Sequence, residues 1–222
     1  MDAARARASE ARARMVADQL RKRDIRDERV LAAMTAVERD AFVPERDRDA
    51  AYADSPLPIG GGQTISQPYI VARMTELLAV GTGDRVLDVG TGSGYQAAIL
   101  AELGCLVTSI ERDPDLALAA MERLGTAGYD DRVIVIVGDG SLGAPDEAPW
   151  DGILVAAGAP AIPDPLRLQL GDGRRLVIPV GGLREQSLMV VERHGDEWTE
   201  WSDGPCVFVP LVGAEGWTAS SL

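Results

Sequence analysis

Apolar residues recur along this chain in two spacings, and the spacing differs between regions. Near the N-terminus they lie three or four positions apart, as in Val16 and Leu20, which predicts helices over 3–22 and 27–37. Further on, short apolar runs alternate with helical stretches. Parallel strands are predicted at 86–89, 105–110, 133–137, 150–156 and 175–179, and helices between them at 96–103, 115–124 and 163–170. Two last strands, 186–193 and 205–211, have no helix between them and should be antiparallel.

This order of elements predicts an α/β fold with a mostly parallel, doubly wound sheet and antiparallel C-terminal strands. The length of 222 residues, 46% of them hydrophobic, suits one domain. We expect a helical extension over 1–55 that packs on a core over 56–222. Within that core, 56–69 is too rich in glycine and proline to be a regular element and too apolar to be a linker, so it should be an ordered, functional loop.

A glycine-rich turn follows the first strand of the core. Gly90, Gly92 and Gly94 let a ligand approach the backbone, and the helix that follows offers unpaired N–H groups to an anion. A tight structural turn is the plain alternative. The dinucleotide fingerprint Gly-x-Gly-x-x-Gly would place its last glycine at Tyr95, so the spacing favours S-adenosylmethionine over a nicotinamide cofactor. A nicotinamide-dependent oxidoreductase remains the rival class.

Two further strand ends carry carboxylates. Glu111 ends the second strand, where it could accept both ribose hydroxyls, and Asp139 follows the third strand, where it could accept the adenine amino group. Asp113 and Pro114 begin the intervening helix as N-cap and first-turn proline. Taken alone, Glu111 is equally consistent with a solvated strand end and Asp139 with a turn former. Together with the glycine turn, they predict one nucleoside site.

The charge balance and the small numbers of histidines and cysteines exclude several functional classes of protein. The chain has 22 basic and 35 acidic residues. Residues 1–50 contain 12 of the basic and 11 of the acidic ones, so residues 51–222 contain 10 basic and 24 acidic residues. Such a surface is unsuited to nucleic acid. One histidine and two cysteines cannot supply a metal site or a Ser-His-Asp triad. Because neither a signal peptide nor a membrane span is apparent, we expect a cytoplasmic monomer that binds neither nucleic acid nor membrane.

Five segments together resemble the protein-L-isoaspartate (D-aspartate) O-methyltransferases, and the resemblance spans roughly 15–213. The most specific segment is the loop Gln63-Thr-Ile-Ser-Gln-Pro68, whereas many methyltransferases share the glycine turn. The segments are 57–68, 86–96, 109–112, 137–140 and 208–211. The resemblance implies a single-domain, Rossmann-like, S-adenosylmethionine-dependent methyltransferase. Such an enzyme methylates the α-carboxylate of L-isoaspartyl and D-aspartyl residues in damaged proteins and peptides, and repair then proceeds through a succinimide.

The resemblance also implies site residues. Ser66 falls on the active-site serine, although its plain alternative is an N-cap of the next helix. The substrate loop would include Ile59, Gln63, Thr64 and Ile65. Cofactor contacts would fall on Asp88, Gly90, Thr91, Gly92, Gly94, Glu111, Asp139 and Gly140. Because a carboxylate is ionised near neutral pH, methyl transfer needs no general base, and Ser66 is assigned to position the substrate. An aspartate O-methyltransferase that tailors one dedicated ribosomal peptide is the alternative.

Overall fold

The computed structural model describes residues 2–218 and 220. It contains a seven-stranded sheet in the order β5-β4-β3-β6-β7-β8-β9, parallel from β5 to β7 and antiparallel at β8 and β9. This architecture confirms the predicted fold class. The strands are β3 (Arg85–Val89), β4 (Leu106–Glu111), β5 (Val133–Val137), β6 (Trp150–Val155), β7 (Leu170–Gly181), β8 (Gln186–His194) and β9 (Glu197–Cys206).

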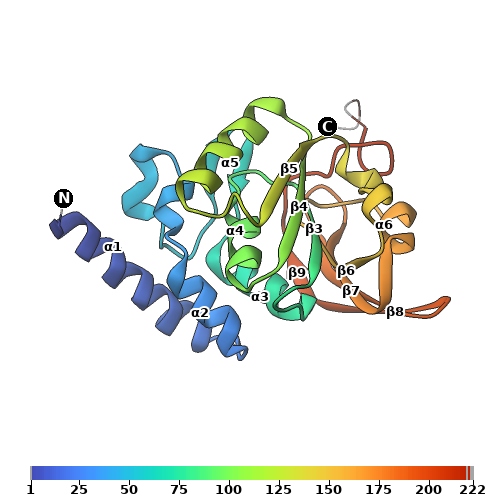
Figure 1. The fold of residues 1–222 in the computed structure, drawn as a ribbon, viewed down its shortest axis with the longest axis horizontal. Coiled ribbons are helices and arrows are strands. Elements are labelled where there is room, and N and C mark those ends of the chain that lie inside the picture. Colours follow the sequence, from blue (N-terminus) through green and yellow to red (C-terminus); the bar gives the residue numbers. More distant parts are fainter. Residues whose placement is uncertain (1, 219, 221–222) are drawn as a thin grey trace.

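Helices cover both faces of this sheet, with α4 and α5 on one side and α6 on the other (Figure 1). Successive side chains of a strand point to opposite faces, and so Val86 and Leu87 of β3 belong to two different hydrophobic clusters. Asp113 caps α5 as predicted, accepting bonds from Asp115 N and Leu116 N. The core helices are α3 (Pro68–Leu78), α4 (Tyr95–Glu102), α5 (Pro114–Thr126) and α6 (Asp164–Leu168), with short 3-10 turns η4 (Gly140–Leu142) and η5 (Pro145–Glu147). Within the described residues, no helix is both long and apolar enough to cross a membrane.

The N-terminal residues share the core of the sheet. Met15, Leu20 and Phe42 are almost fully buried in the same cluster as Tyr95 of α4. The predicted first helix changes at Met15 from an α-helix into a wider π-helix. The elements are α1 (Asp2–Arg14), η1 (Met15–Arg21), α2 (Glu28–Ala36), η2 (Arg39–Phe42) and η3 (Glu45–Ala50).

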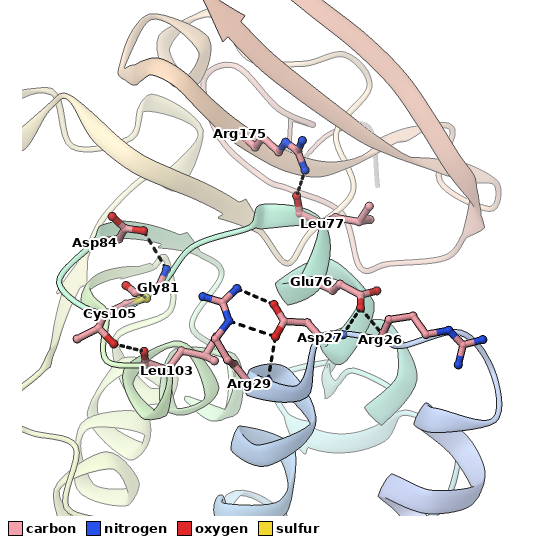
Figure 2. A network of polar contacts seen from close by, with 11 residues as sticks. Arg26, Asp27, Arg29, Glu76, Leu77, Gly81, Asp84, Leu103, Cys105 and Arg175 are labelled. Carbon is pink, nitrogen blue, oxygen red and sulfur yellow. Dashed lines mark hydrogen bonds and ion pairs between the residues drawn. The ribbon is translucent and has the colours of Figure 1, made fainter.

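A polar contact fixes this region to α3. The Glu76 carboxylate accepts bonds from Arg26 N at 2.6 Å and Asp27 N at 2.7 Å, directly before α2 (Figure 2). Asp27 then caps α2 by accepting from Arg29 N at 2.8 Å. Glu76 therefore satisfies backbone donors at the entry to α2 that would otherwise lack partners. The N-terminal region is thus joined to α3 by hydrogen bonds from its backbone N–H groups to the Glu76 side chain, as well as by apolar packing.

Two sequence predictions about strands were wrong. Segment 56–69 is not wholly irregular, because it contains an antiparallel hairpin of β1 (Leu57–Gly60) and β2 (Gln63–Ile65). Gly60 and Gly61 adopt φ values of 101° and 58°, which allows the chain to reverse. The strand predicted at 205–211 lies instead at Glu197–Cys206. Its register is set by the tight turn after β8, where His194 pairs with Glu197.

Candidate active site

A cavity opens at the carboxyl ends of β3, β4 and β6, the edge at which parallel α/β sheets bind ligands. The glycine turn, the hairpin, the start of α4 and the segment after β9 together form its walls. Its lining residues are Gln63, Thr64, Ile65, Ser66, Val71, Met74, Val89, Gly90, Thr91, Gly92, Ser93, Tyr95, Gln96, Ile110, Glu111, Arg112, Gly140, Ala156, Ala157, Val209, Pro210, Leu211 and Val212. The structure therefore brings most of the predicted site residues into one cavity.

The glycine turn presents bare backbone to this cavity. Gly90, Gly92 and Gly94 have φ values of 92°, 53° and 90°, a region that side chains other than glycine rarely adopt. Gly94 does not line the cavity among the described residues, but it forms the N-cap of α4. The positive end of that helix dipole and its free N–H groups favour an anion at the turn.

Glu111 faces the cavity from the end of β4. Its side chain is 9% exposed, and each carboxylate oxygen already accepts one backbone bond. Oε2 accepts from Gly92 N at 2.9 Å and Oε1 from Asp113 N at 3.0 Å. These bonds orient the carboxylate and tie the glycine turn to the entry of α5. Since each oxygen has a second lone pair, Glu111 can still accept from ribose hydroxyls.

Asp88 lies beneath the glycine turn rather than on the cavity wall. It is fully buried, and its Oδ2 accepts from Ser109 Oγ at 2.7 Å. Ser109 Oγ in turn lies 2.6 Å from Thr91 Oγ1, so Asp88 supports the cavity wall through two hydroxyls. Burial raises the pKa of Asp88 to about 7, and the nearby Glu111 charge adds to the rise.

Asp139 also lies outside the cavity lining among the described residues, whereas its neighbour Gly140 is part of it. Asp139 Oδ1 accepts from Ser141 N at 2.9 Å and Ser141 Oγ at 2.6 Å, and Oδ2 accepts from Ala214 N at 2.7 Å. Burial alone would raise the pKa of Asp139, but these bonds lower it below the ordinary value. The carboxylate thus fastens the C-terminal segment to the end of β5.

The hairpin lies against the glycine turn and carries Ser66 at its end. A Cβ built on Gly92 would lie 3.4 Å from Ile59 Cδ1, so buried Ile59 packs on the turn although it does not line the cavity. The N-cap of α3 is Gln67, without a side-chain cap, and the N-cap alternative for Ser66 was therefore wrong. The half-buried Ser66 hydroxyl faces the cavity without a hydrogen-bond partner among the described residues.

Several lining residues were not predicted. Ser93 lies within the glycine turn, Tyr95 and Gln96 follow it directly, and Arg112 follows Glu111. Their position beside the motifs was the available signal, because the first turn of the helix must share the glycine turn's surroundings. Val209, Pro210 and Leu211 were expected to belong to a strand over 205–211, which concealed their role as cavity wall, and Val212 lies just beyond that predicted strand.

Comparison with known proteins decides the family. The model of the protein-L-isoaspartate(D-aspartate) O-methyltransferases matches residues 10–216. The chain belongs to this family. A protein-L-isoaspartate O-methyltransferase of Methanoculleus marisnigri is 56% identical over 207 residues, or 93% of either chain. One from Pelobacter propionicus is 55% identical and covers 91% of both chains.

Solved structures of the protein-L-isoaspartate O-methyltransferases agree. One has a TM-score of 0.82 at 26% identity and covers 92% of this chain and 67% of its own. A second, from Plasmodium falciparum, is described in complex with S-adenosyl-L-homocysteine. It has a TM-score of 0.76 at 25% identity and covers 89% of this chain and 96% of its own. The chain is therefore an S-adenosylmethionine-dependent methyltransferase, and the nicotinamide-dependent rival is wrong. None of these relatives favours the peptide-tailoring alternative.

Proposed function

We propose that this protein transfers a methyl group from S-adenosylmethionine to the α-carboxylate of L-isoaspartyl and D-aspartyl residues in damaged proteins and peptides. The ester then closes to a succinimide, and its hydrolysis returns part of the residue to normal aspartate. The family match over 10–216 carries this proposal. Its structural support is the hairpin, which places the family-specific Gln63-Thr-Ile-Ser66 segment on the same cavity as the glycine turn.

S-Adenosylmethionine supplies a methyl group on a positively charged sulfur. The chain offers backbone N–H groups at the glycine turn for the carboxylate of the cofactor, and the Glu111 carboxylate for its ribose. We assign adenine to the Gly140 side of the cavity. Asp88, Thr91 and Asp139 then serve this site by holding its walls, with Asp88 and Asp139 acting from outside the cavity lining.

Ser66 is assigned to orient the isoaspartyl carboxylate. Its hydroxyl makes no hydrogen bond with another described residue and can donate to a carboxylate oxygen of the substrate. The carboxylate is already ionised near neutral pH, so no residue has to remove a proton before methyl transfer. The reaction therefore depends on orientation and on the exclusion of water, and the largely apolar wall around Ile65 and Leu211 suits that requirement.

The test is transfer of labelled methyl to a peptide that contains one isoaspartyl residue, beside the same peptide with a normal aspartyl residue. We expect labelling of the isoaspartyl peptide alone, and the label should leave as methanol when the succinimide forms. Equal labelling of both peptides, or of neither, would contradict the proposed substrate.

The acidic surface of residues 51–222 supports action on proteins rather than nucleic acids. We assign the chain to the cytoplasm as a monomer without membrane attachment. Both cysteines, Cys105 and Cys206, are free thiols, as expected in a reducing compartment. Residues 1–55 are assigned as an extension of a single catalytic domain over 56–222.

A further inference from the structure

The segment after β9 leaves the sheet and continues as a loop (Figure 1). Its residues line the cavity. Strand β9 ends at Cys206, yet Val209, Pro210, Leu211 and Val212 all contribute to the cavity wall. A stretch without a continuous ladder needs other bonds to hold it in one conformation. Those bonds identify the residues on which this wall depends.

Gln186, the first residue of β8, supplies two of them and makes a third bond to Gly182 in the turn before β8. Its side chain is 2% exposed, and its Oε1 accepts from Phe208 N at 2.8 Å. Its Nε2 donates to Phe208 O at 3.3 Å and to Gly182 O at 3.1 Å. The amide thus bonds both backbone groups of Phe208, as a neighbouring strand would. One side chain replaces the ladder at the point where the wall begins.

Gly158, just beyond β6, holds the middle of the wall. Its N–H donates to Val209 O at 2.7 Å, and its carbonyl accepts from Leu211 N at 2.8 Å. A Cβ at Gly158 would lie 2.6 Å from the Gln186 amide. The glycine therefore allows Gln186 to sit against the backbone between β6 and the wall. Its neighbour Ala157 lines the cavity, so the Gln186 amide is close to the cavity but outside it.

We propose that Gln186 is a positioning residue for the protein substrate. Its amide fixes Val209–Val212 as the wall against which the damaged peptide binds. Glu111, Gly140 and the glycine turn are assigned to the cofactor, which leaves this apolar wall for the second substrate. This inference rests on the proposed function, because it assumes that an isoaspartyl peptide occupies the same cavity.

Gln169 provides a matched control. It is 6% exposed, its Oε1 accepts from Ala144 N at 2.8 Å, and its Nε2 donates to Leu142 O at 2.8 Å. It therefore makes the same paired contact with backbone as Gln186, but the segment it holds does not line the cavity among the described residues. Replacing either glutamine by methionine removes the side-chain partner of one backbone N–H and of at least one backbone carbonyl.

The experiment measures KM for an isoaspartyl peptide, the Kd for S-adenosylhomocysteine and the melting temperature. Gln186→Met should raise the peptide KM by about tenfold or more and leave the Kd within about twofold. Gln169→Met should lower the melting temperature without changing KM. Three results would each overturn the proposal: an unchanged peptide KM in Gln186→Met, a rise in its Kd for S-adenosylhomocysteine equal to the rise in KM, or the same rise in KM in Gln169→Met.

Gln186→Glu gives a second readout, because it has nearly the same shape. Its carboxylate can accept from Phe208 N but repels the two carbonyls until it is protonated. We expect a raised peptide KM near pH 8 that falls toward the wild-type value as the pH is lowered to about 6. A KM independent of pH would contradict the assignment. Failure of the wild-type protein to methylate the isoaspartyl peptide would instead reject the proposed function.

Discussion

The Ser66 hydroxyl faces the cavity and makes no hydrogen bond with any other described residue. Ser66→Ala therefore removes no bond of the folded chain, and the melting temperature should be unchanged. If the hydroxyl donates to the substrate carboxylate, kcat/KM for an isoaspartyl peptide should fall by about 10- to 100-fold. The Kd for S-adenosylhomocysteine, measured by calorimetry, should stay constant. Activity that survives intact would remove Ser66 from the reaction.

Asp88 gives a pH-dependent prediction, because burial raises its pKa to about 7 from a usual value near 4. Between these values the unfolded chain releases the proton while the folded chain keeps it. The stability contributed by Asp88 is thus present at low pH and is lost as the pH rises toward 7, by at most about 4 kcal/mol.

The measurement compares urea unfolding of the wild type and Asp88→Asn without cofactor. Asparagine imitates the protonated acid and does not titrate, so the variant should gain relative stability as the pH rises from about 4 to about 7. A difference that stays constant over this range would show that Asp88 has an ordinary pKa in the folded protein.

At the scale of elements, the glycine turn is a part of the site whose backbone conformation requires glycine, because its three glycines have positive φ values. Gly92→Val adds a β-branched side chain at a φ of 53°, beside Ile59 and on the cavity wall. We expect it to raise the Kd for S-adenosylhomocysteine by at least about tenfold, because strain and blocked volume act together.

Gly83→Val separates these two effects. Gly83 has a φ of 87° with no atom within 4 Å of a Cβ, and it does not line the cavity among the described residues. This variant carries comparable backbone strain and should bind the cofactor normally. If both valine variants bind equally well, the glycine turn does not contact the ligand.

The sequence predicted elements best where local pattern and tertiary packing agree. The central strands β3 and β6 are largely apolar and buried on both faces. The edge strand β5 also falls on 133–137 as predicted, although Ile134 and Val137 are exposed. The segment 205–211, wrongly predicted as a strand, is apolar for another reason, since Phe208 and Leu211 are buried in the hydrophobic clusters without a continuous ladder. Periodicity records burial and does not distinguish these two causes.

The prediction of site residues likewise succeeded where the signal is local in sequence and failed where it depends on tertiary contacts. Residues within a motif, such as Gly92 and Glu111, were placed correctly on the cavity. The positions of Asp88 and Asp139, beneath and beside the wall, depend on which backbone donors and hydroxyls reach their oxygens. Ser141 lies only two residues from Asp139, but Ser109 and Ala214 are distant in sequence from the carboxylates that they bond, and no local pattern reveals these two partners.

On the scale of the whole molecule, one apolar cluster extends from Met15 in the N-terminal region to Phe208 beside the cavity wall. Arg73 of α3 adds a polar link, since its guanidinium bonds both Glu76 and Asp203 of β9. The N-terminal helices, the sheet and the cavity therefore belong to one packed unit. Stability and site geometry are expected to be coupled throughout this unit.

The hydrogen bonds of the Asp139 carboxylate also affect the chemical ageing of the protein itself. Asparagine is absent from the sequence, so isoaspartate can form here only from aspartate, most readily where glycine follows. That reaction requires the side-chain carbonyl carbon to meet the next backbone nitrogen. All four such aspartates have oxygens held by bonds to other groups: Asp139, Asp151, Asp172 and Asp203.

The folded chain should therefore accumulate isoaspartate at these four positions more slowly than the same sequence in urea. Mass spectrometry of samples aged at neutral pH and body temperature measures the difference. Equal rates in both samples would show that the bonds give no protection. Slower ageing in the folded state means that a catalyst of protein repair is, through its own hydrogen bonds, a poor candidate for the damage it corrects.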